Sequence, residues 1–147
     1  MKILVDSCAW SVALRRKNGT AGMKPAEMRL VSALVEAIKD GRVVLVDPVR
    51  QEVLSGIREV AQFGKVRQHL DAFPDAAIES QDYIAAARLD NLCRTAGVHC
   101  GVVDMLLCAV AERNNWTILT NDGGLIRCLE VLELNHPERR EKPAKAS

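Results

Sequence analysis

The 147-residue sequence lacks any long apolar run. No stretch approaches the ~20 consecutive apolar residues that a membrane-spanning helix needs. The N-terminus also lacks a basic region followed by an apolar segment of signal-peptide length, because Asp6 interrupts the first apolar stretch early. These absences argue against a membrane-spanning or secreted protein, and we expect a cytoplasmic protein with no membrane partner.

Two chemical motifs are missing as well. The five cysteines are odd in number, and no pair has the C-x-x-C spacing of a zinc site. A disulfide framework is not expected either, since a chain of this length can bury enough surface to fold without cross-links. Gly19 and Gly22 follow no strand and precede no Gly-Lys-Ser/Thr ending, so they do not form a P-loop.

An excess of charge of one sign is also lacking. The net charge is +1, from 20 basic and 19 acidic residues, which neither demands nor excludes a nucleic-acid partner. The distribution is more informative, because basic residues cluster in three places. Such clusters are compatible with phosphate contacts and equally with ordinary solvated surface. They are Arg15 to Lys17, Arg50 with Arg58, and Lys65 with Arg67.

What the sequence does contain is an alternation of strand-length apolar runs with helical patterns. Strands are expected at 2–5, 43–46 and 116–119, with short candidates at 76–79 and 131–134. Helices are expected at 9–16, 25–39, 47–56, 59–70, 82–96 and 102–113, with a short one starting at 121–122. This alternation predicts an α/β fold with a mostly parallel sheet. We expect one domain over residues 1–134 and a polar, disordered tail over 135–147.

Acidic residues fall at the predicted carboxyl edge of this sheet, where open α/β sheets bind their ligands. Asp6 directly follows the first strand, and Asp122 comes three residues after Leu119, the end of another strand. Glu52 lies one turn into the helix after the second strand and, taken alone, resembles a surface residue. Asp6 and Asp122 also suit a simpler role as helix N-caps, so for each residue alone both interpretations stay open.

Asp104 is the most unusual of these acids. It is the only charged residue from Val102 to Ala111, in a pattern so apolar that the helix should be buried. A buried carboxylate needs a partner or a metal, because the helix dipole contributes only ~0.3–1 kcal/mol to an exposed acid. The four acids together favour a hard cation such as Mg²⁺ or Mn²⁺, which prefers oxygen ligands and can activate water beside a phosphate.

The four acids and their neighbours resemble the motifs of the PIN-domain ribonucleases, in particular the VapC-type toxins of bacterial toxin–antitoxin pairs. The likeness spans about residues 1–134 and is carried by LVDSCAW, DPVRQEVLSG, VVDMLLCAVA and ILTND. The resemblance implies a three-layer α/β/α fold around a parallel sheet. It also implies a Mg²⁺- or Mn²⁺-dependent endoribonuclease that leaves 5′-phosphate and 3′-hydroxyl ends.

The same resemblance implies roles for individual residues. Asp6, Asp104 and Asp122 would hold the metal directly or through water, and Glu52 would ligate through water or orient the nucleophile. Candidate contacts to the RNA are Ser7, Arg15, Arg16, Arg50 and Asn121. Family members usually form homodimers, and a small antitoxin protein usually blocks their acidic groove.

Two positions depart from the family pattern. Cys8 stands where Ser or Thr is common, and a thiol is only a weak hydrogen-bond donor and acceptor. Polar support for the site is therefore reduced unless Ser7 supplies it. The family's fourth motif often reads T-x-D-x-D-F, but here Gly124 replaces the second acid, so a second metal ion is not expected.

These departures leave two other functions open. The first is a PIN-like module that has lost catalysis and acts by binding RNA or protein. The second is a small α/β phosphatase or nucleotide-binding enzyme, which ranks last because the chain has no nucleophile motif or phosphate loop.

Overall fold

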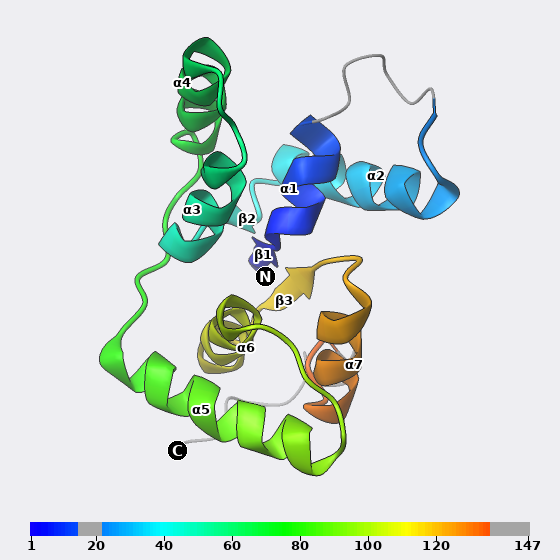
Figure 1. Ribbon diagram of the computed structural model, residues 1–147, viewed down its shortest axis with the longest axis vertical. Coiled ribbons are helices and arrows are strands. Elements are labelled where there is room, and N and C mark those ends of the chain that lie inside the picture. The colour runs from blue at the N-terminus through cyan, green and yellow to red at the C-terminus, as the bar shows by residue number, and fades with distance from the viewer. Residues whose placement is uncertain (15–21, 136–147) are drawn as a thin grey trace.

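A three-stranded parallel sheet lies in the middle of the molecule (Figure 1). The structure is a computed structural model, and it describes residues 1–14 and 22–135. In the sheet, β1 (Ile3–Val5) lies between β2 (Val43–Val44) and β3 (Thr117–Leu119), and both neighbours run parallel to it. All three strands therefore end at the same edge of the sheet, which the alternation of strands and helices predicts.

Helices cover both sides of this sheet. They are α1 (Ser7–Leu14), α2 (Pro25–Lys39), α3 (Asp47–Ser55), α4 (Val60–Leu70), α5 (Ser80–Thr95), α6 (Val102–Asn114) and α7 (Gly123–Val131). α1 packs against α2 and α3, α5 packs against α6 and α7, and Figure 1 shows the two groups on opposite sides of the strands. The predicted three-layer α/β/α fold is thereby confirmed. Within the described residues, no helix combines the length and apolar character needed to cross a membrane.

The apolar character of the strands and of α6 follows from where they lie. Leu4 and Val5 of β1 are almost completely buried, as expected for a parallel sheet covered on both faces. In α6, every residue from Met105 to Ala111 is buried. Burial of this surface, at about 25 cal/mol per Å² of apolar area, is the main contribution that stabilises the fold. It also brings Asp104, in the first turn of α6, close to the core.

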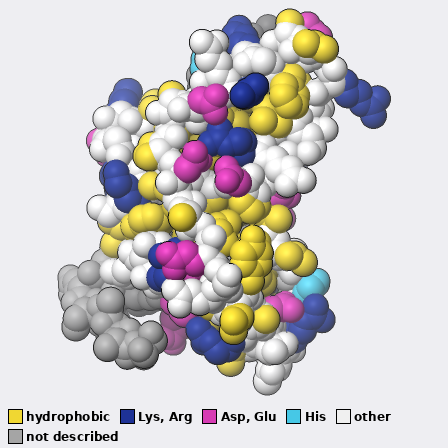
Figure 2. Space-filling view, turned by 90° about the vertical axis from the view of Figure 1, so that its left-hand side faces the viewer, with side chains coloured by type: hydrophobic (Ala, Val, Ile, Leu, Met, Phe, Trp, Pro, Cys, Tyr) yellow, Lys and Arg dark blue, Asp and Glu magenta, His cyan; other side chains and the backbone are white. Residues whose placement is uncertain are grey.

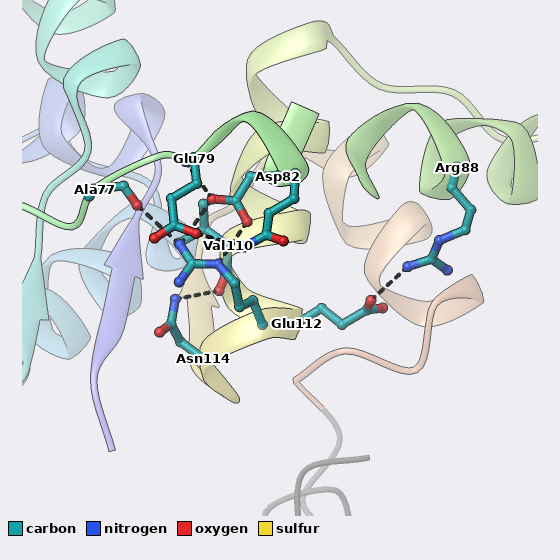
Figure 3. Close-up of polar contacts among 9 residues, drawn as sticks. Ala77, Glu79, Asp82, Arg88, Val110, Glu112 and Asn114 are labelled. Carbon is teal, nitrogen blue, oxygen red and sulfur yellow. Dashed lines mark hydrogen bonds and ion pairs between the residues drawn. The ribbon is translucent and has the colours of Figure 1, made fainter. Parts of the chain in front are cut away.

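An ion pair between a buried carboxylate and a partly exposed guanidinium joins the start of α5 to the end of α6. Asp82 is 1% exposed and accepts hydrogen bonds from Nε of Arg113 at 2.8 Å and from Nη2 at 2.9 Å. Figure 3 shows Asp82 and Glu79 together with a second link between the helices, in which Arg88 donates to Glu112 at 3.0 Å. Burial raises the pKa of Asp82, but the hydrogen bonds from Arg113 and from the N–H of Glu79 outweigh it, and the pKa lies below its ordinary value.

The strand predicted at 76–79 is wrong, and a single bridge lies in its place. Asp75 pairs in parallel with Leu45, just beyond β2. The N–H of Leu45 donates to the carbonyl of Pro74 at 2.9 Å, and the N–H of Ala76 donates to the carbonyl of Leu45 at 2.8 Å. Beyond Ala76 the segment leaves the sheet, and the carbonyl of Ala77 accepts a hydrogen bond from Nη2 of Arg113 at 3.1 Å instead.

The strand predicted at 131–134 is also wrong, because the segment ends a helix. The N–H of Leu134 donates to the carbonyl of Leu129 at 2.9 Å, and the N–H of Glu133 donates to the carbonyl of Glu130 at 3.2 Å. Glu133 adopts a left-handed conformation with φ of 55°. This is the Schellman arrangement that closes helices, usually with glycine at the left-handed position. Leu134 is buried by this turn rather than by strand pairing.

Asn135 then closes the outer edge of β3. Its side-chain amide accepts a hydrogen bond from the N–H of Ile118 and donates one to the carbonyl of Ile118, both at 2.8 Å. A side chain thus satisfies main-chain groups that an unprotected edge strand would offer to another strand. Asn135 is the first residue of the predicted 135–147 tail. Residues 136–147 and 15–21 lie outside the described residues, so the expectations for them stay predictions.

Candidate active site

The four acids singled out from the sequence come together at the carboxyl edge of the sheet. Asp6 follows β1, Glu52 lies on α3, Asp104 is in the first turn of α6, and Asp122 immediately precedes α7. Their closeness is evident in the pKa of Asp104, which is raised to about 6. Burial is the largest cause, followed by the negative charge of Asp6, with smaller contributions from Asp122 and Glu52.

Asp6 is held by hydrogen bonds to both of its carboxylate oxygens, and it is only 3% exposed. Oδ1 accepts the N–H of Ser7 at 2.8 Å. Oδ2 accepts the thiol of Cys8 at 3.1 Å and the hydroxyl of Thr120 at 2.9 Å. The side chain thus binds the N–H of the first residue of α1 and is fixed at the edge of the sheet at the same time. The two interpretations of Asp6 are compatible with each other.

Thr120 is the site residue that sequence reasoning missed. Besides donating to Asp6, its hydroxyl accepts the N–H of Asp122 at 3.0 Å and lies 3.3 Å from Sγ of Cys8. One hydroxyl therefore links the acid that follows β1 to the acid that precedes α7. The signal that was available is positional, because Thr120 directly follows β3 and stands two residues before Asp122.

Asp104 and Asp122 each bind a main-chain N–H at the start of a helix. Oδ2 of Asp122 accepts the N–H of Leu125 at 2.9 Å, so Asp122 is the N-cap of α7. Oδ2 of Asp104 accepts the N–H of Gly101 at 3.1 Å, just before α6. The capping interpretation of Asp122 is thus confirmed, and it leaves the second carboxylate oxygen available to a ligand.

Ser7 is associated with Glu52 through its side chain. Burial raises the pKa of Glu52, the charge of Asp6 raises it further, and a hydrogen bond from the Ser7 hydroxyl lowers it. The hydroxyl of Ser7 therefore supports Glu52, whereas Asp6 receives only the main-chain N–H of Ser7. Ser7 does not replace the hydroxyl that Cys8 lacks in the contact with Asp6.

Arg50 is engaged by three carboxylates. Its guanidinium forms ion pairs with Asp47 at 3.5 Å, with Asp71 at 2.8 Å and with Asp75. These contacts tie the end of α4 and the bridge beside β2 to α3. Figure 2 views that side of the molecule and shows acidic, basic and apolar side chains interspersed there. The predicted contact of Arg50 with RNA therefore finds no support in its surroundings, which give it a structural role.

The other candidate RNA contacts are less defined. Asn121 is exposed beside the acids, and its main-chain N–H hydrogen-bonds to the sulfur of Cys8. Burial raises the pKa of Cys8, so the residue is present as a thiol and not as a thiolate. Arg15 and Arg16 lie outside the described residues.

The carboxylates at the sheet edge are the kind of ligand that a hard cation prefers, but they are not arranged as a closed metal site. Among the described residues, no group of three or more His, Cys, Asp and Glu side chains is placed to hold a metal ion. Mg²⁺ is commonly bound through one or two carboxylates and several waters, and these acids fit that looser mode.

No cation of the protein neutralises these acids in the part of the chain that the structure describes. None of the ion pairs there involves Asp6, Glu52, Asp104 or Asp122. Within the described ranges the clustered acids thus form no ion pair with the protein, and a divalent metal ion bound there would reduce the repulsion among them.

Gly124, which stands in place of the second acid of the fourth motif, lies close to the site. A Cβ at this position would lie 3.3 Å from Oδ2 of Asp122 and 3.4 Å from the carbonyl oxygen of His99. A side chain here would therefore require the Asp122 carboxylate to shift by a few tenths of an ångström.

A cavity of about 450 Å³ lies beside β3 and does not coincide with the acids. Apolar residues Ile118, Ile126, Leu129 and Leu134 make up much of its wall, and Thr120 is its one link to the acid site. The candidate active site is accordingly assigned by its chemistry and by its place at the carboxyl edge, and not by the size of a cavity.

Comparison with known proteins adds independent information. The sequence model of the PIN domain family matches residues 3–128, a span that includes all four acids. No curated protein matches the chain. PIN domains are generally metal-dependent nucleases, and the layered α/β/α architecture described above is a nuclease-type fold of this kind. The chain belongs to the PIN domain family.

Proposed function

We propose that this PIN-domain protein is a Mg²⁺- or Mn²⁺-dependent endoribonuclease that hydrolyses RNA phosphodiester bonds. The observation that carries the proposal is Asp104, a carboxylate at the start of a buried apolar helix with a pKa raised to about 6. Holding such a charge without a cationic partner destabilises the fold. A divalent cation bound at the edge would offset that cost, and metal dependence is general in the family.

The surroundings of each acid support a distinct role. Asp6, Asp104 and Asp122 would hold the ion directly or through water, each with one oxygen already fixed by a main-chain N–H. When bound, the ion would supply positive charge to the scissile phosphate and a more acidic water. Glu52 is exposed and is held by the hydroxyl of Ser7, which suits it to orient the attacking water.

We further propose that the protein is the toxin of a type II toxin–antitoxin pair, that it forms a homodimer, and that a cognate antitoxin blocks the acidic edge. The order of the acid motifs supports this assignment. The neighbouring gene provides a direct test. A short adjacent reading frame for a DNA-binding protein with a basic C-terminal segment, whose product relieves toxicity on co-expression, is the expected finding.

The nuclease proposal is tested with purified full-length protein and single-stranded and structured RNA. Cleavage is expected with Mg²⁺ or Mn²⁺ and should stop with EDTA. Asp104→Asn should abolish cleavage while the protein stays folded. Asp40→Asn makes the same change at the C-cap of α2, beside the opposite edge of the sheet, and should leave the rate unchanged. An Asp104→Asn variant that cuts as fast as the parent would show that the assignment is wrong.

A second candidate function is a PIN-fold module that binds RNA or protein without cutting. Three observations favour it: the thiol of Cys8 beside Asp6, the absence of the second acid at Gly124, and the lack of a ready metal-holding group among the described residues. Calorimetry with Mn²⁺ separates the two functions. Absence of binding at millimolar Mn²⁺ would favour the binding module.

A further inference from the structure

Arg127 is a cation at the edge of the candidate active site that the sequence motifs do not point to. It lies on α7, one turn after Gly123. Its Nη1 atom is 3.4 Å from the position that a Cβ at Gly123 would occupy. Helical side chains tilt toward the N-terminus of their helix, so a long side chain in the second turn reaches the helix start. The guanidinium is thereby held beside the residue that follows Asp122.

Arg127 differs from the arginines that stabilise the fold. Arg50 contacts three carboxylates, and Arg113 binds the buried Asp82. Arg127 is exposed, and over residues 1–14 and 22–135 no carboxylate forms an ion pair with it. Its donors are therefore available to a ligand from outside the described part of the chain.

The chemistry of the site indicates which ligand suits this position. Four carboxylates at one edge repel the phosphates of an approaching RNA strand. Contacts from Lys and Arg to backbone phosphates provide most of the affinity of such proteins for nucleic acid. The planar guanidinium of arginine can donate two hydrogen bonds to one phosphate. A guanidinium at the start of α7, not paired with a carboxylate of the described residues, can hold a phosphate adjacent to the one that faces the acids.

We propose that Arg127 binds a backbone phosphate of the RNA next to the bond that is cut, and so positions the strand over the acids. This inference rests on the proposed function of the same edge. Arg127 is then a positioning residue, and because it contacts phosphate it adds affinity without sequence preference.

The test is fluorescence anisotropy of a labelled single-stranded RNA with the full chain in EDTA, where the strand is bound and not cut. Arg127→Gln should weaken binding about 3- to 10-fold. The slope of the logarithm of the binding constant against the logarithm of the salt concentration should become shallower by about 0.7, which is the contribution of one phosphate on a single strand. Arg127→Lys keeps the charge and should recover most of the affinity. Lys39→Gln removes an equal charge at the last turn of α2, by the opposite edge, and should stay within about twofold of the parent.

Two results of this test would overturn the inference. The first is parental affinity and salt dependence in Arg127→Gln. The second is equal weakening by Lys39→Gln, which would assign the effect to net charge. Thermal unfolding of Arg127→Gln should match the parent, since its guanidinium makes no ion pair within the described residues.

Steady-state cleavage separates this inference from the proposed function. If the parent binds RNA through Arg127 but cuts none with Mg²⁺ or Mn²⁺, the nuclease function fails and the phosphate contact stands. If the parent cuts RNA and Arg127→Gln keeps the parental KM, the phosphate contact fails and the nuclease function stands. A parent that neither binds nor cuts RNA overturns both.

Discussion

Asp82 and Asp104 occupy equivalent positions at the starts of neighbouring helices, yet their environments are opposite. Asp82 receives two hydrogen bonds from Arg113, and its pKa is lowered. Asp104 has no cationic partner in the described residues, and its pKa is raised to about 6. Arg113 stands at the far end of the helix that Asp104 begins. The arginine of α6 therefore pairs with Asp82, the structural acid, and not with Asp104, the acid at the sheet edge.

The same division extends beyond these two residues. Asp47, Asp71 and Asp75 share Arg50, and they hold α3, α4 and the bridge beside β2 together. The acids at the carboxyl edge bind main-chain N–H groups, hydroxyls and a thiol instead. Structural acids are thus paired with arginine, whereas the edge acids form no ion pair among the described residues and keep a negative charge that an external cation can use. Sites that keep such unpaired charge commonly do so at some expense of stability.

The largest effect is expected for Asp104→Asn. Cleavage should fall by at least about 10³-fold, more than the 10- to 100-fold loss typical of residues that only support a metal ligand. The amide oxygen can still accept the N–H of Gly101, so the start of α6 should persist. Single-turnover cleavage with Mn²⁺ measures the loss, and a decrease of less than tenfold would contradict a direct role.

The same variant should change stability with a defined pH dependence in EDTA. Because the folded pKa of Asp104 is raised from 3.8 to about 6, the folded state binds its proton more tightly than the unfolded state. The ionised carboxylate therefore destabilises the fold most fully above about pH 6 and not at all below about 3.8. Asp104→Asn should unfold at a higher temperature than the parent at pH 7, and the difference should vanish as the pH falls toward 4.

The opposite result is expected for Arg113→Ala. Removing the partner leaves the buried carboxylate of Asp82 without its cation, which should destabilise the fold by about 1–3 kcal/mol because the Arg113 side chain is partly exposed. Since the pKa of Asp82 is lowered, the pair stabilises the protein above the ordinary pKa of Asp, and this is lost as the pH falls through the folded value. Urea unfolding of the parent and the variant at pH 7 and at acidic pH measures the destabilisation and its pH dependence. Equal stability of parent and variant at pH 7 would refute the structural role of the pair.

The positions of the edge acids could be predicted from the sequence because they depend on local patterns of residues. The apolar run of residues 3–5 ending at Asp6, and the lone charge of Asp104 in an apolar helix, placed both acids at the sheet edge. The strand at 131–134 was misread because short alternation of apolar and polar residues also suits the end of a helix followed by a turn. The left-handed conformation of Glu133 and the main-chain hydrogen bonds of Glu133 and Leu134 distinguish the two.

Long-range partners were beyond the reach of sequence reasoning. The ion pairs of Arg50 with Asp71 and Asp75 are of this kind, because these acids lie more than 20 residues away from Arg50 in the chain. Thr120 was missed for a similar reason, since its link to Asp6 spans 114 residues. Such pairings follow from the packing of strands and helices, and a pattern of nearby residues does not report them.

A smaller effect is expected for Thr120→Val. The variant keeps the shape of the side chain and removes the hydroxyl that donates to Asp6 and accepts from the N–H of Asp122. Metal affinity and cleavage should fall about 10- to 100-fold. Thr120→Ser keeps the hydroxyl and should restore most of both. If Val and Ser variants bind Mn²⁺ equally well, the hydroxyl does not position the acids.

The smallest effect is expected for Cys8→Ser. A hydroxyl donates a stronger hydrogen bond to Asp6 than the thiol does. A gain of about 0.5–1 kcal/mol corresponds to a rise in cleavage of roughly two- to fivefold. Cys8→Ala removes the donor and should lower cleavage by a similar factor. Identical rates in the Ser and Ala variants would show that the donor at this position does not matter.

The central claim is that the edge acids keep their charge unpaired in order to bind a divalent cation. Isothermal titration calorimetry with Mn²⁺ on the parent and on Asp104→Asn tests it most directly. The parent should bind Mn²⁺ at millimolar concentration or below, Asp104→Asn should lose this binding, and Asp40→Asn should retain it. A parent that shows no Mn²⁺ binding at millimolar concentration, or an Asp104→Asn variant that binds as the parent does, would contradict the claim.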